Sequence, residues 1–473
     1  MPRPLLFAVT LAAMLGGCTP GGAREPAGSA SPDAGIAFVG VDVVPMDRPE
    51  VLRDRTVVVR RDRIVAMGPR GSVRVPPGAL RIDAAGRYLM PGLFDMHVHV
   101  PSLTPGDSSR VRPLLGLLVA QGVTSARSMV GHPSHLALRD TLRRGRIAAP
   151  TLVFAAPQIT GPATRSAYFA RFMAATPDAA RERVRRHAEA GFDFIKLTAG
   201  MTPEVFEAVV QQARGLGIPV SGHLSAAVGL RKALDAGYQV EHLDAYLEAA
   251  VADSASGRSS ESQLAPGEIL AHVDPAKLRE AARATAAAGV YNTPTLSFFE
   301  VTTIREVPLD SLLALPDAAY FSAAAVEAMS AAHRQYWADP PAAEERRRFG
   351  EFRRAATRAL TEAGAPIMVG SDTPQRFQHY GYGTLREIEA LVAAGLTPFQ
   401  ALEAATRVPA EYLGWGGEAG TVAVGRRADL LLLRGNPLDD VGVLRSPEGV
   451  VLRGRWLPEG ELEALRRAAR APR

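Results

Sequence analysis

Short apolar runs recur along this chain, and several of them end in a side chain that can bind a metal. The first run begins at Leu89 and closes on His97-Val98-His99. Alternate residues of a β-strand share a face, so both imidazoles are expected to point the same way. Two nitrogen ligands presented together are half of a transition-metal site. A bare His-x-His is more often a polar strand face, but on a buried strand two unpaired imidazoles would be costly.

Four later runs supply candidate partners for this histidine pair. Each is a short β-like run followed by a helical pattern, and the runs end in Lys196, His223, His242 and Asp372. In a barrel of alternating strands and helices, the carboxyl ends of all strands meet at one mouth, where such enzymes place their chemistry. Any one of these residues is weak evidence, because a histidine at a strand end is commonly a structural residue. Together, and in this order, they predict a metal site.

The same patterns predict an α/β fold, a (β/α)8 TIM-like barrel. Helical patterns at 179–190, 204–216 and 353–363 separate several of the strands. Two insertions, roughly 247–275 and 299–350, follow the sixth and seventh strands and are expected to overhang the mouth as lids or binding surfaces. The eight strands of the barrel are expected near residues 93–99, 123–128, 151–156, 193–198, 218–223, 239–243, 291–297 and 366–371.

Both ends of the chain are expected to contribute to one small β-sandwich. Its strands would lie at 36–44, 56–67, 81–82, 429–433 and 450–456, with turn residues between them. The domain boundaries that follow are a signal peptide at 1–18, a flexible tether at 19–35, the composite β-sandwich at 36–88 and 408–457, the barrel at 89–407 and a C-terminal tail at 458–473.

The amino terminus has the pattern of a targeting segment. Arg3 precedes an apolar stretch that ends in Leu15-Gly-Gly-Cys18, which is similar to a bacterial lipobox. Cys18 would then carry a lipid and become the first residue of the mature protein. This predicts a lipoprotein of the bacterial cell envelope, anchored to a membrane on its periplasmic side. The alternative is an ordinary secretory signal with an incidental cysteine. Cys18 is the only cysteine, so no disulfide can form within the chain.

Composition limits the classes of partner. The 473 residues have a formal net charge of +5, and no dense Lys/Arg tract with interleaved aromatic residues occurs, so nucleic-acid binding has little support. After the targeting segment, no stretch approaches the long uncharged run that a transmembrane helix needs. We therefore expect a small-molecule substrate, with assembly into a homo-oligomer left open.

The motifs, taken together, resemble the amidohydrolase superfamily of metal-dependent hydrolases, over about residues 36 to 457. Its imidazolonepropionase-like and Xaa-Pro dipeptidase (prolidase) branch is the most similar. The resemblance extends to segments outside the candidate ligands, namely Gly86 to Asp95, Leu396 to Thr406 and Gly420 to Leu430.

The resemblance implies a role for each candidate ligand. His97 and His99 would bind a first metal ion, and His223 and His242 a second. Lys196, carboxylated by carbon dioxide to a carbamate, would bridge the two ions. Asp372 would touch the first ion and act on the nucleophilic water.

The implied activity is hydrolysis of a carbon–nitrogen bond of amide type by a metal-bound hydroxide. Two divalent ions, expected to be zinc, would supply that hydroxide, because bound zinc lowers the pKa of its water to about 7. Asp372 would be the catalytic acid–base group that moves the proton to the leaving amine. Lys196 matters only if it is modified, and the alternative is a lysine paired with a carboxylate. The substrate could be a dipeptide, an N-acyl amino acid or a cyclic amide.

Two other functions remain open. One is a mononuclear deaminase-like or imidazolonepropionase-like enzyme with unmodified Lys196. The other is a lipid-anchored binding protein without turnover, which the presence of all six ligand positions disfavours.

Substrate contacts are expected from polar residues that follow the barrel strands. An arginine there could bind a carboxylate bidentately, and a histidine could orient a carbonyl. Prolidases of this branch usually carry a histidine after the third strand, whereas here Pro162-Ala-Thr-Arg165 follows Gln158-Ile-Thr-Gly161, which puts dipeptidase activity of the familiar type in doubt. The candidate contacts are Arg127, Arg165, Tyr246, Arg376 and His379, with Tyr168 a weaker one.

Overall fold

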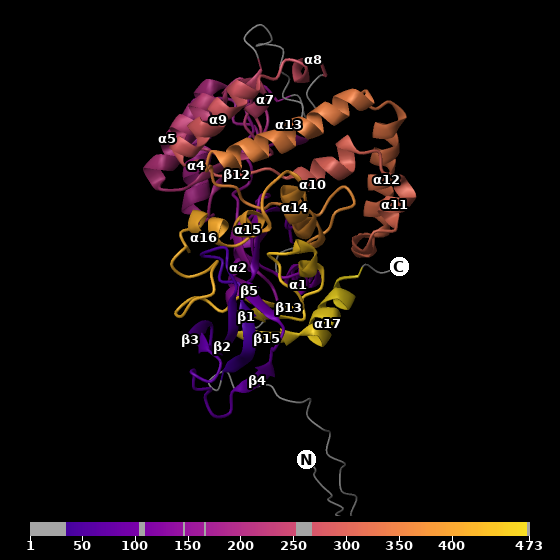
Figure 1. Cartoon of the computed structure of the whole chain (residues 1–473). Helices are drawn as coiled ribbons and strands as arrows, with labels where there is room; N and C mark the ends of the chain where they lie inside the picture. The colour runs from indigo at the N-terminus through magenta and orange to yellow at the C-terminus, as the bar shows by residue number, and fades with distance from the viewer. Residues whose placement is uncertain (1–34, 104–108, 145–146, 165–166, 252–266, 471–473) are drawn as a thin grey trace, which may run out of the picture.

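The computed structural model describes residues 35–103, 109–144, 147–164, 167–251 and 267–470. The chain has an α/β fold. A sheet built from both ends of the chain lies at one end of the molecule, and the long helices that follow the later strands lie at the other (Figure 1).

Two short parallel sheets form the centre of the larger part. One has three strands, β6 (Leu93–Val98), β7 (Val123–Ser128) and β8 (Thr151–Phe154). The other has four strands in the order β12 (Asn292–Thr293), β11 (Gln239–Glu241), β10 (Val220–Gly222) and β9 (Ile195–Leu197). Strands are therefore present at seven of the eight expected positions, although all of them except β7 are shorter than expected.

The eighth expected strand, at 366–371, is not a strand in the structure. Instead, isolated parallel bridges join Asn292 to Ile367 and Val98 to Thr373. The segment still runs between β12 and β6, because Met368 donates its N–H to the carbonyl of Asn292. The left-handed backbone of Asp372, with φ of 57°, ends the extended run directly after this segment.

Helices follow most of the strands, and local sequence explains where they begin and end. Helices α4 (Pro177–Glu189), α5 (Pro203–Leu216) and α9 (Pro275–Ala288) each begin with proline after a threonine or aspartate whose side chain accepts a backbone N–H. That is a typical N-terminal signature. The helices expected at 179–190 and 204–216 correspond to α4 and α5. The pattern at 353–363 is the second half of a longer helix, α13 (Ala343–Glu362).

The strands from the two chain ends form one sheet, the composite sheet, in a continuous hydrogen-bonded order. A β-sandwich was expected here. The expected strand 56–67 is a hairpin that turns at Arg61, and 450–456 is another that turns at Arg453 and Gly454, all three with positive φ. The order is β15 (Arg455–Pro458), β14 (Gly449–Leu452), β13 (Leu430–Leu433), β5 (Tyr88–Pro91), β1 (Ile36–Val43), β2 (Leu52–Arg60) and β3 (Arg63–Pro69), with β4 (Leu80–Asp83) paired to β1.

The expected C-terminal tail, 458–473, contains a helix, α17 (Glu459–Ala469), that packs on α1 (Val111–Ala120). Leu462 is fully buried, and the Arg466 guanidinium donates to the carbonyl of Ala120 at 2.7 Å. The apolar face of this helix therefore belongs to the folded body.

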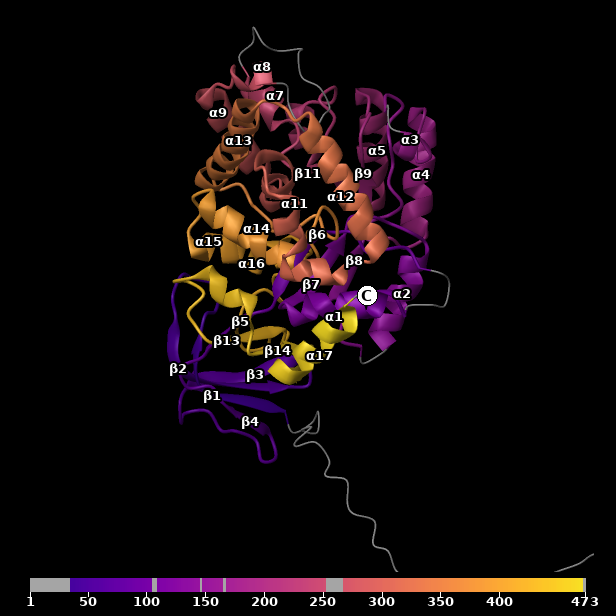
Figure 2. The same cartoon turned by 90° about the vertical axis from the view of Figure 1, so that its right-hand side faces the viewer.

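The insertion expected at 299–350 is helical and is attached to the body by a buried ion pair. It contains η2 (Glu300–Ile304), α11 (Leu309–Leu313), η3 (Pro316–Tyr320) and α12 (Ala323–Ala338) and runs into α13. Asp317 on η3 is fully buried and pairs with Arg386 at 2.7 Å on α14 (Tyr382–Ala393). Figure 2 shows α11 and α12 beside the body. The first insertion includes α7 (Tyr246–Ala250) and α8 (Gly267–Leu270), and 252–266 lie outside the described residues.

Among the described residues, every helix is too short or too polar to cross a bilayer.

Candidate metal centre

Three of the predicted ligands converge where β6, β11 and the 367–373 segment end. His97, His242 and Asp372 each offer one ligand atom, and these atoms lie within 4.8 Å of one another. All three residues are buried, with exposed fractions of 1%, 3% and 5%. A compact group of two imidazoles and a carboxylate has the composition of a zinc or related divalent site.

The other two predicted histidines lie beside this group. Nε2 of His99 is 3.1 Å from Oδ1 of Asp372, and Nε2 of His97 is 3.4 Å from the same oxygen. The ring of His223 stacks on that of His242, with centroids 4.6 Å apart. The structure thus brings four histidines from three strand ends into one cluster, in which three lie near Asp372 and His223 stacks on His242.

The Nδ1 atoms of three of these histidines are held by acceptors. His97 Nδ1 lies 2.8 Å from Glu241, and His223 Nδ1 lies 2.8 Å from Asp244. His242 Nδ1 lies 2.8 Å from Oγ1 of Thr295, whose own proton goes to the carbonyl of Pro294. Acceptors at Nδ1 favour the tautomer that leaves the Nε2 lone pair free for a metal.

Sequence reasoning missed Glu241, Asp244 and Thr295. Part of the signal was available, because Glu241 and Asp244 flank His242 in Val240-Glu-His-Leu-Asp244, and a glutamate that ends a buried strand needs a partner. Thr295 could not have been found that way, since it reaches His242 only through the folded loop after β12.

Arg127 was expected to contact the substrate, and the structure corrects this. Its side chain is fully buried beneath the ligands, where Nη2 pairs with Glu241 at 2.5 Å and Nε donates to the carbonyl of Met96 at 2.7 Å. Nη1 donates to the hydroxyl of Tyr412 at 3.1 Å. The reason is its position within β7 rather than after it. Arg127 therefore supports Glu241 and, through it, His97.

Burial controls the protonation of the histidine ligands. Desolvation holds the pKa of His97 and of His242 well below the usual value and lowers that of His99 to about 3, and the positive charge of Lys196 acts in the same direction. The imidazoles are consequently neutral at physiological pH, which is the form that binds metals.

Lys196 lies on β9 next to this group and is 3% exposed. Its burial lowers its pKa, while the carboxylates of Glu241 and Asp372 oppose that shift. Gly222, on the neighbouring strand, makes room for it, because a Cβ there would lie 3.0 Å from Lys196 Cδ and 2.2 Å from the Leu197 carbonyl oxygen. Burial likewise raises the pKa of Asp372 to about 7.

The donor set fits a metal ion. Oδ1 of Asp372 is buried without a hydrogen-bond donor, although it faces the two Nε2 atoms of His97 and His99. With Nδ1 of His97 engaged by Glu241, the Nε2 lone pair of His97 and Oδ1 of Asp372 face each other as two acceptors, an arrangement that a cation between them would stabilise. A divalent ion held by His97, His242 and Asp372 would satisfy these acceptors.

The remaining predicted contacts lie in different environments. Tyr246 is fully buried, and its hydroxyl is 2.8 Å from Thr285 and from Asn292, so it is a core residue rather than a substrate contact. Positive φ angles at 242, 243 and 245 turn it inward. His379 is 2% exposed and packs against Phe321 with ring centroids 4.7 Å apart. Arg165 lies outside the described residues, Tyr168 is 53% exposed, and Arg376 lies at an exposed turn.

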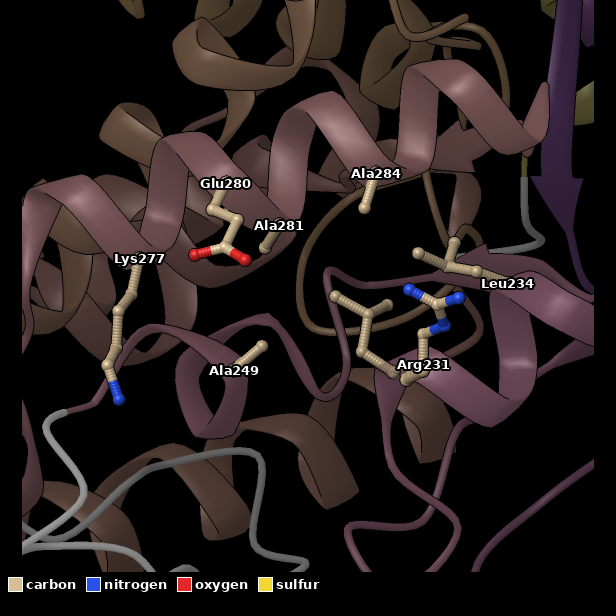
Figure 3. Close-up of a pocket in the computed structure, with 8 residues that line it drawn as sticks. Arg231, Leu234, Ala249, Lys277, Glu280, Ala281 and Ala284 are labelled. Carbon is tan, nitrogen blue, oxygen red and sulfur yellow. The ribbon is translucent and has the colours of Figure 1, made fainter.

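A surface pocket of about 300 Å3 lies among helices α6 (Leu230–Ala236), α7 and α9, away from these ligands (Figure 3). Leu234 and Ala281 contribute apolar surface to it, and Arg231, Lys277 and Glu280 contribute charged groups. None of the predicted site residues lines it.

Comparison with known proteins identifies the family. The sequence profile of the amidohydrolase family matches residues 88–457, so the chain belongs to this family. Adenine deaminase 2 of Bradyrhizobium sp. (strain ORS 278) is 28% identical over 206 residues, which are 42% of this chain and 33% of that enzyme. The alignment thus spans about a third of this curated relative.

Solved structures of similar fold cover the chain more completely. A structure described as a putative prolidase from Bifidobacterium longum is 27% identical with a TM-score of 0.65, covering 92% of this chain and 98% of that one. The bottromycin amidohydrolase AH is 28% identical with a TM-score of 0.71, covering 92% and 91%.

Proposed function

We propose that this protein is a metal-dependent hydrolase that cleaves a carbon–nitrogen bond of amide type. The observation that carries the proposal is the convergence of His97, His242 and Asp372 within 4.8 Å, with the Nδ1 atoms of both histidines already occupied. Family membership and the similarity to a putative prolidase and to bottromycin amidohydrolase support it.

The fold proposed for the catalytic part is a closed (β/α)8 barrel with the composite sheet as a separate small domain. The parallel bridges support closure: Ala155 pairs with Phe194 between the two sheets, Asn292 with Ile367, and Val98 with Thr373. In the proposed barrel, these bridges would link the eight segments into a ring whose carboxyl ends carry the proposed ligands.

We further propose two metal ions, most suitably zinc. His97 and His99 would hold one, His223 and His242 the other, and Asp372 would contact the first. Lys196, carboxylated by carbon dioxide, would bridge them. Burial favours this modification because it lowers the pKa of Lys196, and a neutral amine is the form that reacts with carbon dioxide.

Within this site each residue has a defined task. A bound divalent ion would polarise the carbonyl of the substrate and lower the pKa of a bound water. The Asp372 carboxylate takes the proton of the attacking water and returns it to the leaving amine nitrogen. Glu241, Asp244 and Thr295 hold their histidine rings in one orientation.

A deaminase is the second candidate, because adenine deaminases are among the relatives. In that case one metal ion would bind, Lys196 would remain an unmodified amine and the attacked carbon would belong to a heterocycle. A lipid anchor on Cys18, location at the periplasmic side of a membrane and assembly into homo-oligomers remain proposals that rest on the sequence.

A substrate screen tests the proposed function. Metal-replete protein, prepared with zinc and bicarbonate, is incubated with dipeptides, N-acyl amino acids, cyclic amides and adenine. Release of a free amine from an amide substrate supports the proposal, and the same screen with Asp372→Asn excludes a contaminating hydrolase. Release of ammonia from adenine alone would favour the deaminase.

A further inference from the structure

A tight turn follows Asp372 and presents an arginine at its tip. The N–H of Gln375 donates to the carbonyl of Gln378 at 3.0 Å, and the N–H of Gln378 donates back at 2.9 Å. Arg376 and Phe377, between them, have φ angles of 48° and 61°. Two successive non-glycine residues in the left-handed region are uncommon and persist only where the surroundings enforce them, often at ligand sites.

Contacts on one side of the turn fix its position. Phe377 is 3% exposed, and its N–H points at Sδ of Met329 on α12, 3.3 Å away. The side-chain amide of Gln375 donates to the carbonyl of Asp372 at 2.8 Å. The turn is thus attached to the large insertion and to the proposed catalytic aspartate, which leaves little freedom for Arg376.

Arg376 differs from the other arginines around the site. It is exposed, and within the described part of the chain no hydrogen-bond acceptor or carboxylate pairs with its guanidinium. Arg127 and Arg386 have carboxylate partners, and Arg353 donates to the carbonyls of His242 and Pro294. The ring of Phe298 lies beneath the Arg376 guanidinium, with Cζ 5.2 Å from its centroid, and orients it.

The negative charge of Asp372 acts favourably on Arg376, although the two do not form an ion pair. A metal ion held by Asp372 would take up this negative charge. The guanidinium, on the turn that Gln375 ties to Asp372, would then be an uncompensated cation with a planar pair of donors, the arrangement that proteins use to bind carboxylates.

We propose that Arg376 binds a carboxylate of the substrate. The substrate class is then an amide that carries a free carboxylate, such as an N-acyl amino acid or a dipeptide, rather than an uncharged cyclic amide or a nucleobase. This inference rests on the proposed amide hydrolysis, because it places the scissile bond at Asp372 and the carboxylate at Arg376.

Binding measurements test the inference independently of turnover. A panel of N-acetyl amino acids and their carboxamides is titrated calorimetrically into the metal-replete Asp372→Asn protein, and into the same protein that also carries Arg376→Met. We expect at least one acid to bind roughly 10-fold or more tightly than its amide, and Arg376→Met to remove that preference. Arg376→Lys should keep part of the preference for the acid, because lysine retains the positive charge but lacks the two parallel N–H donors of the guanidinium. Arg231→Met, at an exposed site on α6, is the matched control and should keep the preference.

Kinetics with the acid and amide pairs provide the second arm. Arg376→Met should raise KM for the acid by about 10-fold or more with a smaller change in kcat, and leave the amide unchanged. Equal affinity of acid and amide for the parent protein, or an acid preference that survives Arg376→Met, overturns the inference. Failure to hydrolyse any amide overturns the proposed function instead, while the calorimetric result still decides the role of Arg376.

Discussion

Glu241 lies 2.8 Å from Nδ1 of His97, and its other carboxylate oxygen pairs with Arg127 at 2.5 Å. Ser221 donates to the same oxygen as Arg127, at 2.7 Å. All of these groups are buried, so the ring of His97 is held from below by a charged network and not only by packing. The orientation of the most buried ligand therefore depends on residues that cannot touch the substrate.

Replacing Glu241 with glutamine should weaken metal binding. The amide cannot serve both His97 and Arg127 as the carboxylate does, and loss of such a partner typically costs ~10–100-fold in metal affinity. It also leaves Arg127 buried without its counter-charge, which costs about 3–5 kcal/mol of stability. Competition with a chelator measures the first effect and thermal unfolding the second.

The double variant Arg127→Met with Glu241→Gln separates these two effects. Removing the unpaired cation should recover much of the stability without restoring metal affinity. Metal affinity that returned together with stability would show that the network acts only on folding.

Asp372→Asn should lower kcat by ~10²-fold or more on any amide that the wild type hydrolyses, because the amide cannot accept the proton of the attacking water. The histidine ligands remain, so most of the metal should be retained. Steady-state kinetics and elemental analysis of one preparation measure both quantities. A turnover close to that of the wild type would show that a group other than Asp372 is the acid–base catalyst.

Glu387 should make stability depend on pH. It is buried on α14, where it accepts the N–H groups of Leu296 and Ser297 at 2.8 and 2.7 Å, and burial raises its pKa to about 7. The folded state then binds a proton more tightly than the unfolded state. The free energy of unfolding that this proton adds is fully present below pH 4.5. It declines as pH rises towards 7 and is absent above it.

The glutamine variant of Glu387 lacks this titration. The difference in Tm between wild type and Glu387→Gln should therefore be larger at pH 5 than at pH 8. Glu389→Gln, on the same helix but paired with Arg445 nearer the surface, is the control. A difference that grows from pH 5 to pH 8 would contradict the assignment.

Cys18→Ser should abolish lipidation and leave the protein soluble or unprocessed when it is expressed with its own amino terminus. Membrane fractionation and mass spectrometry of the mature amino terminus measure this. A wild-type protein that is exported and fractionates without detergent would contradict the lipid anchor.

The clustering of His97, His242 and Asp372 could be predicted from sequence because each lies at the end of a short apolar run, and the carboxyl ends of such runs converge in this fold. The expected limits of β7 also agree with the structure. Arg127 could not be placed in this way, since an arginine near a strand end serves equally well in the mouth or beneath it. Thr295 joins His242 across 53 residues, a contact that only the fold creates. The burial of Tyr246 could not be predicted either, because it depends on the positive φ angles at 242, 243 and 245 that direct the chain inward.

Metal counting tests the central claim most directly. Protein purified with zinc and bicarbonate should contain about two zinc ions per chain, with Lys196 found as its carbamate in a crystal structure of the same preparation. Lys196→Ala should lose metal and activity together, and a short carboxylic acid that fills the vacated bridge should restore part of both. One ion or fewer per chain in metal-replete wild type, with Lys196 unmodified, would contradict the binuclear centre.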